Sequence, residues 1–154
     1  MDNVPIDEQV AVLMNGSEFG DEGLRLFMTN ELRKRLIHVH NEGRCLRVYC
    51  GYDVTGPHLH LGHTVTMRKL RQFQDFGHEV TFLVGNFTSL IGDASDKETA
   101  RKLRSEDEIK RDADTYAGQV FRILDRSKTS VRYNNEWLGQ LSFNSLIDFA
   151  SLYT

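Results

Sequence analysis

The sequence predicts an α/β fold, in which a helical N-terminal segment, residues 1–44, precedes the first half of a doubly wound parallel sheet, residues 45–154. Two short apolar runs, 45–50 and 79–84, have the composition of buried strands, and an amphipathic stretch of helical length separates them. A strand, helix, strand succession requires parallel strands and a right-handed crossover. Ligands of such a sheet bind at the carboxyl ends of its strands, so we expect a site in the segments that follow the strands.

The N-terminal segment is predicted to be helical but shows no chemistry. Residues 6–14 form a short amphipathic stretch, and Thr29 or Asn30 can cap a second helix that ends at about Asn41. The apolar residues that share one face of this second helix are Leu32, Leu36 and Val39. We interpret the segment as a packing element that covers the sheet.

The remaining elements follow from helix caps and apolar periodicity. A helix over 60–76 with Gly77 as its terminator comes after the first strand, and a third strand is predicted at 129–133. A capping box at 105–108 opens a long helix, and Ser142 caps a last one. In helix 60–76 the expected buried residues are Leu61, Val65, Leu70 and Phe73, and the expected solvated ones are Arg68, Lys69 and Arg71. The expected buried stripe of the long helix is Ile109, Ala113, Tyr116, Val120, Phe121 and Leu124.

The length indicates a single domain, and the net charge indicates no overall basic surface for nucleic acid. The 154 residues carry a net charge of −3, so any contact with RNA must come from a local patch or from another part of the protein. Cys45 and Cys50 lie in one predicted strand, where they cannot easily form a bridge. This cysteine usage fits a reducing cytosol. Because no apolar run reaches membrane-spanning length and the first residues lack a signal pattern, we expect a cytoplasmic protein without a membrane partner.

The stretch 51–63, GYDVTGPHLHLGH, joins the first strand to the following helix. Gly51 is expected to end the strand, and the helix start offers unpaired N–H groups and a positive dipole end that suit a phosphate. His60 and His63 share one face of the first turn, and Gly62 leaves room for a flat ring to approach the backbone. A cap or surface role is the alternative for each histidine. A metal site is disfavoured, because the pair lacks a third ligand at metal spacing.

This thirteen-residue stretch resembles the HIGH signature of class I aminoacyl-tRNA synthetases, in the form found in tyrosyl-tRNA synthetases, where G-[FY]-D-x-T precedes L-H-[IL]-G-H. The resemblance continues through MRKLRQFQDFGHEV at 67–80, GNFTSLIGD at 85–93 and YNNEWLG at 133–139. It implies a Rossmann-like catalytic domain, of which this chain is the N-terminal part. We expect the chain to be cut at Thr154, before the second half of the pocket, the lysine-rich KMSKS loop and the anticodon domain.

The resemblance implies a tyrosine–tRNA ligase, which forms tyrosyl-adenylate from L-tyrosine and ATP and then transfers the amino acid to tRNA(Tyr). Mg²⁺ is expected to accompany ATP without a protein metal site, and tRNA to bind mainly through parts that this chain lacks. The full-length protein is expected to be a homodimer, and the fragment alone to have weak or no complete activity. Two alternatives are a non-catalytic synthetase-like fragment and the nucleotide-binding half of a tryptophanyl-type class I synthetase.

The roles on the phosphate side come from the same resemblance. His60 and Thr55 are expected to donate to the γ-phosphate. Lys97 and Arg101 are expected to reach the leaving pyrophosphate, and His63 borders the nucleotide; these five are the expected catalytic residues. The expected ATP contacts are Cys50, Gly51, Asp53, Gly62 and Thr66. The family's D-P-[ST]-G-[KR] is replaced here by DASDK, which leaves a charge-rich helix end as the alternative for Lys97 and Arg101.

Four residues are assigned to the amino-acid side. Tyr49 is expected to meet the substrate phenol through a buried hydroxyl, and a core strand residue is the alternative. Asp93 is expected to bind the substrate ammonium, with a helix cap as its alternative. Thr88 and Asn134 complete the expected tyrosine-binding set, Asn134 from an Asn-rich loop that borders the pocket.

Overall fold

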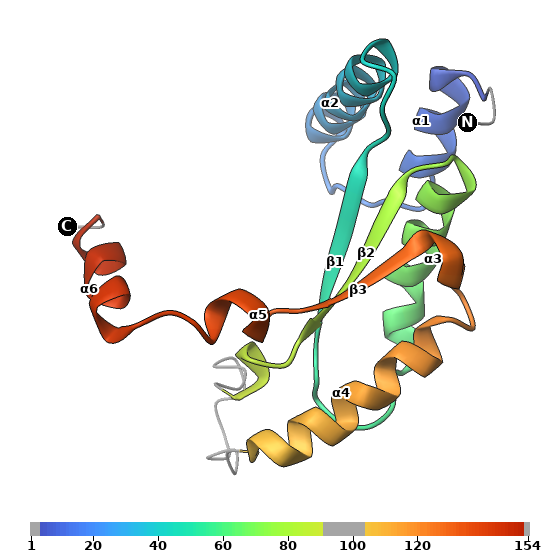
Figure 1. Ribbon diagram of the computed structural model, residues 1–154. Helices are drawn as coiled ribbons and strands as arrows, with labels where there is room; N and C mark the ends of the chain where they lie inside the picture. The colour runs from blue at the N-terminus through green and yellow to red at the C-terminus, as the bar shows by residue number, and fades with distance from the viewer. Residues whose placement is uncertain (1–3, 91–103, 153–154) are drawn as a thin grey trace. The chain divides into compact units, whose positions relative to one another are not determined.

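The computed structural model describes residues 4–90 and 104–152. It contains a three-stranded parallel sheet in the order β1-β2-β3, flanked by helices, which confirms the predicted α/β fold (Figure 1). In the described residues no helix is both long and apolar enough to cross a membrane. The elements in chain order are α1 Ile6–Met14, α2 Glu22–Asn41, β1 Arg47–Asp53, α3 Leu61–Asp75, β2 Glu79–Gly85, η1 Thr88–Leu90, α4 Glu106–Val120, η2 Arg126–Lys128, β3 Thr129–Tyr133, α5 Asn135–Leu138 and α6 Phe143–Ser151.

The contacts divide the chain into two compact units. The first comprises Met1–Cys50, His60–Thr81 and Val120–Ser130, and the second comprises Gly51–Leu59, Phe82–Gln119 and Val131–Thr154. Each strand therefore begins in the first unit and ends in the second. The HxGH turn, residues 60–63, belongs to the first unit, and the carboxyl ends of the strands belong to the second.

The N-terminal helices pack on α3 within the first unit. Val10 and Leu13 of α1 and Leu36 of α2 form a buried cluster. The partly buried apolar residues around this cluster are Ile6, Met14, Leu32, Leu46, Phe73 and Phe76. A helix as short as α1 is marginal by itself in water. Burial of such side chains contributes about 1.5–3 kcal/mol each, so packing holds α1 in place.

Helix α2 corrects the predicted helix start. The carboxylate of Asp21 accepts hydrogen bonds from the backbone N–H groups of Gly23, at 3.2 Å, and Leu24, at 2.8 Å. Asp21 is therefore the cap, and the expectation of a cap at Thr29 or Asn30 is wrong. Thr29 lies inside the helix, where its hydroxyl donates to the carbonyl four residues earlier at 2.7 Å. A threonine that bonds back in this way satisfies its hydroxyl without ending the helix.

Strand β1 extends beyond its predicted end. Gly51 lies inside the strand, which runs on to Asp53, so the expectation that Gly51 ends it is wrong. The buried ring of Tyr52 stacks on Phe82 of β2, with the ring centroids 4.7 Å apart. A stacked pair of this kind contributes about 0.5–1.5 kcal/mol beyond its buried area. This contact holds β1 against β2 past the glycine.

Helix α3 is one residue shorter at each end than the predicted helix 60–76, and it turns a different face inward. Gly77 follows the helix with a φ of 81°, as expected for its terminator. The predicted stripe is wrong at Leu61 and Val65, which are 80% and 68% exposed. The buried residues of the helix are Met67, Leu70 and Gln74. Their spacing of three and four places them on one face, which the apolar pattern missed because one of them is a glutamine.

Lys69 of α3 was expected to face solvent, but its side chain binds carbonyl groups at the carboxyl end of α1. Its ammonium donates to the carbonyl of Asn15 at 2.9 Å and approaches that of Val12 at 3.5 Å. Burial lowers the pKa of Lys69 from its ordinary value. A cation beside the last carbonyls of a helix interacts favourably with the helix dipole, so Lys69 stabilises the carboxyl end of α1.

Gln74 fastens α3 to the connection that enters β3. Its side chain is fully buried, and Nε2 donates to the carbonyls of Asp125 and Lys128, at 3.3 and 3.0 Å, and to Oγ1 of Thr129 at 2.7 Å. Its Oε1 accepts from the N–H of Asp125 at 3.0 Å. Both ends of the amide are therefore used within the first unit, and one glutamine satisfies several backbone groups of the connection.

The later elements largely agree with the sequence-based expectation. Strand β3 has its predicted bounds, and Ser142 accepts from the N–H of Ser145 at 3.1 Å as the cap of α6. The capping box is confirmed, because Ser105 N–H donates to Glu108 at 3.0 Å and Glu108 N–H donates to Ser105 at 3.3 Å. The expected stripe of α4 is confirmed at Ile109, Ala113, Tyr116 and Val120, which are buried. It is wrong beyond Val120, where the helix ends, so that half-buried Phe121 and buried Leu124 lie in the turn that follows.

We expect the stability of the chain to fall in mild acid because of His78. This imidazole is 7% exposed, and its Nδ1 accepts from the N–H of Leu46 at 3.3 Å. Burial lowers the pKa of His78 from 6.5, so the unfolded chain binds this proton more readily than the folded protein does. The contribution of His78 is therefore complete above about pH 6.5 and declines as the pH falls toward the lowered pKa.

Urea unfolding across this range measures the effect. His78→Asn keeps an acceptor for Leu46 but cannot titrate, so its midpoint should depend less on pH than the wild-type midpoint. An equal decline in both proteins would assign the acid sensitivity to other groups.

Candidate functional site

The two histidines of the HxGH turn form a pair at the start of α3. The backbone N–H of His60 donates to Nδ1 of His63 at 3.1 Å. The rings stack, with their centroids 3.8 Å apart and 24° between their planes. A Cβ on Gly62 would lie 3.0 Å from the His60 ring, so the glycine permits this arrangement. The structure thus brings the histidines together as their spacing predicted.

The pair places hydrogen-bond donors at the positive end of a helix. Burial, and then the neighbouring His60, lower the pKa of His63, so the neutral form of its imidazole is favoured at pH 7. Because Nδ1 accepts from His60, the proton of the neutral ring sits on Nε2, which can donate. Thr66, on the next turn, donates its hydroxyl to the carbonyl of His63 at 3.0 Å. Donors at a helix N-terminus suit an anion such as phosphate.

In the second unit, three predicted site residues form a cluster at the carboxyl ends of the strands. Asp53 ends β1, Thr88 follows β2 and Asn134 follows β3. The hydroxyl of Thr88 donates to Oδ1 of Asp53 at 2.6 Å and accepts from Nδ2 of Asn134 at 3.0 Å. Asn134 is 6% exposed, and its Oδ1 accepts from the N–H of Phe87 at 2.8 Å. One hydroxyl therefore joins residues from the ends of all three strands.

Gly85 was not predicted as a site residue, yet the cluster depends on it. A Cβ at this position would lie 2.1 Å from Oδ1 of Asp53 and 2.7 Å from Oγ1 of Thr88. No side chain can approach so closely, so only glycine lets Asp53 and Thr88 meet. The available signal was a glycine at the end of a strand and before a polar loop, where it often marks close approach of two segments.

The loop that precedes the HxGH turn is fastened by α4. The carbonyl of Pro57 accepts from Oγ1 of Thr115 at 2.6 Å and from Nε2 of Gln119 at 2.8 Å. Oε1 of Gln119 accepts from the N–H of Leu59 at 2.9 Å. These supporting residues were also missed, because only the folded chain brings them to a loop about sixty residues away. Their effect is to fix the carbonyl and N–H groups of the loop.

Thr55, a predicted phosphate donor, lies in the same loop beside buried Tyr116. Burial raises the pKa of Tyr116, and hydrogen bonding with Thr55 and Gly56 opposes that rise. The carbonyl of Val54, at the start of the loop, accepts from the guanidinium of Arg104 at 2.9 Å. Arg104 also forms an ion pair with Asp112. The backbone around Thr55 is therefore held by protein contacts along its length.

Residues 41–152 match the family model described as tRNA synthetases class I (W and Y). The chain belongs to this family. The matched range includes the HxGH turn and the strand-end cluster of Asp53, Thr88 and Asn134.

Two curated relatives of this class I chain are tyrosine–tRNA ligases. It is 41% identical over 149 residues to tyrosine–tRNA ligase 2 of Clostridium acetobutylicum, an alignment that covers 97% of this chain and 36% of the relative. It is 46% identical over 149 residues to the tyrosine–tRNA ligase of Xanthomonas campestris pv. campestris, covering 97% of this chain and 34% of the relative. The resemblance to tyrosyl-tRNA synthetases is therefore confirmed. The chain spans about a third of the length of these relatives.

A solved class I synthetase has the same fold. The tyrosyl-tRNA synthetase of Archaeoglobus fulgidus, complexed with L-tyrosine, superposes with a TM-score of 0.69 at 23% sequence identity. The superposition covers 97% of this chain and 40% of that chain. At this level of identity it supports the fold alone.

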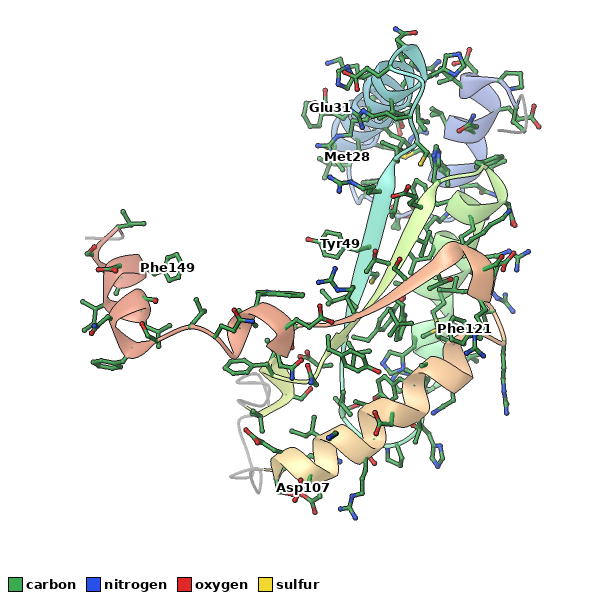
Figure 2. All side chains as sticks on the ribbon, in the orientation of Figure 1. Met28, Glu31, Tyr49, Asp107, Phe121 and Phe149 are labelled. Carbon is green, nitrogen blue, oxygen red and sulfur yellow. The ribbon has the colours of Figure 1, made fainter. Side chains whose placement is uncertain are left out.

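Tyr49 departs from its expected environment in the synthetase fold. Its side chain is 71% exposed and projects away from β1 (Figure 2). The expectation of a buried hydroxyl is therefore wrong in the described structure, and so is the alternative of a core residue. The reason is the alternation of the strand, in which Tyr49, Gly51 and Asp53 lie on the exposed face while Tyr52 is buried.

The other predicted synthetase residues divide between the units. Cys50 lies with the HxGH turn in the first unit, and Gly51 lies with the strand-end cluster in the second. Asp93, Lys97 and Arg101 lie outside the described residues. Within residues 4–90 and 104–152, no group of three or more His, Cys, Asp or Glu side chains could hold a metal ion. Cys50 does not form a disulfide with Cys45.

Proposed function

We propose that the whole protein is a tyrosine–tRNA ligase, which activates L-tyrosine with ATP and transfers it to tRNA(Tyr). Relatives at 41% and 46% identity carry that name. The observation that carries the proposal is the HxGH turn, where stacked His60 and His63 sit at the N-terminus of α3. That arrangement supports the binding of a polyphosphate.

The proposed reaction requires hydrogen-bond donors beside the leaving pyrophosphate. A carboxylate oxygen of tyrosine attacks the α-phosphorus of ATP, and the bond from that phosphorus to the bridging oxygen of pyrophosphate breaks. Negative charge moves onto the departing pyrophosphate, so donors positioned there lower the barrier. We assign this role to His60, His63 and Thr55, together with Lys97 and Arg101. A ribose hydroxyl of tRNA then attacks the tyrosyl carbonyl carbon, and AMP leaves.

The remaining assignments divide between the nucleotide and the amino acid. The nucleotide contacts in the proposal are Cys50, Gly51, Asp53, Gly62 and Thr66. Tyr49 and Asp93 are assigned to the phenol and the ammonium of tyrosine. Thr88 and Asn134 are assigned to the same pocket, and their support is the hydrogen-bonded cluster at the strand ends. In that cluster Asn134 positions Thr88 rather than offering a free amide.

The proposed function also involves Mg²⁺, tRNA(Tyr) and a second copy of the protein. Mg²⁺ enters as a companion of ATP, held by the phosphates. tRNA(Tyr) binds mainly through parts of the ligase that lie outside the third of the relatives' length that this chain spans. A second copy completes a homodimer, and the cytoplasm is the proposed compartment.

ATP–pyrophosphate exchange tests the function and separates it from its alternatives. The full product of the gene should exchange pyrophosphate with tyrosine and not with tryptophan. Exchange with tryptophan would indicate a tryptophanyl-type enzyme. Absence of exchange with either amino acid, in a folded full-length protein, would indicate a non-catalytic synthetase-like role.

The strand-end cluster gives a sharper expectation for the tyrosine side. Thr88→Val in the full-length protein removes the hydroxyl shared by Asp53 and Asn134 but keeps the shape of the side chain. The amide of buried Asn134 then loses its acceptor on Thr88, and an unsatisfied buried group costs about 1–3 kcal/mol. The KM for tyrosine should therefore rise about tenfold while the KM for ATP changes little. Thr29→Val, the same change inside α2, is the matched control. A fall in thermal stability with both KM values unchanged would make Thr88 a purely structural residue.

A further inference from the structure

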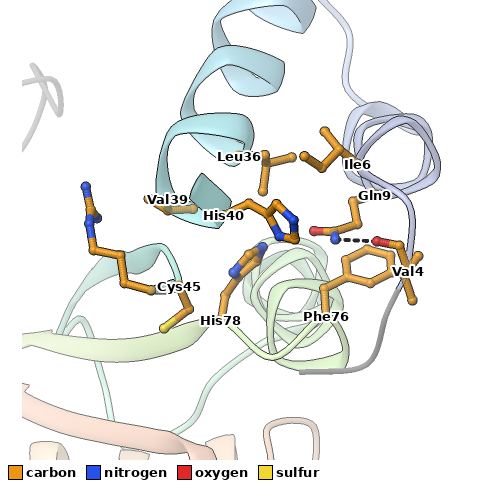
Figure 3. Close-up of a pocket in the computed structure, with 10 residues that line it drawn as sticks. Val4, Ile6, Gln9, Leu36, Val39, His40, Cys45, Phe76 and His78 are labelled. Carbon is orange, nitrogen blue, oxygen red and sulfur yellow. Dashed lines mark hydrogen bonds between the residues drawn. The ribbon is translucent and has the colours of Figure 1, made fainter. Parts of the chain in front are cut away.

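A cavity of about 80 Å³ lies inside the first unit (Figure 3). Its walls come from α1 and the residues just before it, the end of α2, the connection into β1, and the turn between α3 and β2. The apolar side chains among its walls are Val4, Ile6, Leu36, Val39 and Phe76. None of the residues assigned to the synthetase reaction lines it, so the cavity is separate from that function.

Two buried polar atoms on the walls have no hydrogen-bond partner among the described residues. The first is Oε1 of Gln9, whose amide nitrogen donates to the carbonyl of Val4 at 2.9 Å. The second is Nε2 of His78, a side chain that is 7% exposed. Buried polar atoms in folded proteins are nearly always paired, so two unpaired atoms on one cavity point to a guest.

The protonation of His78 determines what that guest must offer. Its Nδ1 accepts from the N–H of Leu46 at 3.3 Å, so the neutral ring carries its proton on Nε2 and can only donate there. Burial lowers the pKa of His78, which favours this neutral ring at pH 7. Oε1 of Gln9 can only accept. A guest that satisfies both atoms must therefore accept one hydrogen bond and donate another.

We propose that this cavity binds a hydroxyl group, supplied by water or by a short-chain alcohol, that accepts from Nε2 of His78 and donates to Oε1 of Gln9. A simple anion offers no donor to Gln9, and a metal cation offers no acceptor to His78. The volume of about 80 Å³ exceeds the roughly 10–15 Å³ that one water needs, so the cavity has room for a water or a short-chain alcohol.

Crystals of the 154-residue chain, grown without alcohol and then soaked in ethanol, test the proposal. An oxygen within hydrogen-bond distance of both atoms before soaking assigns the hydroxyl to water. Ethanol density with its oxygen at that position assigns the hydroxyl to an alcohol. The proposal is overturned if neither crystal holds such an oxygen and both atoms pair with protein groups instead.

A titration in solution distinguishes a built site from general solvent effects. Ethanol should shift the Leu46 amide resonance saturably, and Gln9→Leu should weaken its affinity at least about fivefold. Acetonitrile, which accepts but cannot donate, should bind more weakly by a similar factor. Cys45→Leu, which fills the cavity from another wall, should abolish saturation, whereas Ile37→Leu, on an exposed position of α2, should not. Equal affinities for ethanol in wild type and Gln9→Leu would overturn an alcohol site. If no protein shows a saturable shift, the crystals decide: a water oxygen between the two atoms supports the proposal, and its absence overturns it.

Discussion

Replacement of His63 by alanine in the full-length synthetase is expected to slow tyrosyl-adenylate formation by about 10²–10³-fold and to leave tyrosine affinity nearly unchanged. The variant loses the Nε2–H donor that we assign to the polyphosphate. It also loses the acceptor that holds the N–H of His60 at 3.1 Å, and the ring on which His60 stacks. One substitution thus disturbs both histidines of the turn. ATP–pyrophosphate exchange and equilibrium tyrosine binding, measured on one preparation, give the two quantities.

The preceding loop offers a matched control for this substitution. His58 is an exposed histidine two residues before His60, and His58→Ala should exchange pyrophosphate at close to the wild-type rate. Loss of a helix cap costs about 1 kcal/mol of stability, so thermal unfolding of each variant separates a damaged fold from a damaged site. A wild-type exchange rate in a folded His63→Ala protein would show that the HxGH turn does not act on the phosphates.

The second large effect is expected on stability, at Gln74. Gln74→Leu preserves the approximate volume but removes every side-chain hydrogen bond to the connection before β3. The hydroxyl of Thr129 still donates to the carbonyl of Asp125 at 2.6 Å, so the groups that lose their partner are the N–H of Asp125 and the carbonyl of Lys128. An unsatisfied buried group costs about 1–3 kcal/mol, and the loss should total about 2–4 kcal/mol of the unfolding free energy. Natural domains have only about 5–15 kcal/mol to lose, so the variant should be near its limit.

Helix α3 supplies the control for this change as well. Gln72 lies two residues earlier, and its Oε1 is buried without a partner in the described part of the chain. Gln72→Leu should therefore be neutral or slightly stabilising, since it removes a buried acceptor that makes no hydrogen bond there. Urea unfolding followed by circular dichroism compares the two variants with the wild type. Equal free energies for both leucine variants would refute the role of Gln74.

Local signals in the sequence were enough for much of the fold. Strand β3 and the caps at Ser105 and Ser142 depend on a few neighbouring residues, and each was predicted correctly. Gln74 could not be predicted, because a glutamine on an inner helix face is favourable only when a distant backbone supplies its partners. The exposure of Leu61 shows the same limit in reverse, since an apolar residue is buried only where another element covers it.

In the functional site, too, local contacts could be predicted from the sequence and long-range contacts could not. The approach of His60 to His63 is a local property of a helix start, and the spacing of the two residues predicted it. The close contact of Gly85 with Asp53 and the bond from Thr115 to Pro57 join segments that only the folded sheet and α4 bring together. Sequence reasoning therefore found residues that offer chemistry and missed those that hold them in place.

The position of Lys69 has a consequence for the order in which the chain folds during synthesis. Helix α1 has no basic residue in its own last turn, and the ammonium that pairs with Asn15 lies 54 residues further along the chain. The N-terminus leaves the ribosome first, so α1 is outside before its cation has been made. With only nine residues, α1 is too short to persist alone in water. The first helix of the chain therefore forms late, after α3 has emerged behind it.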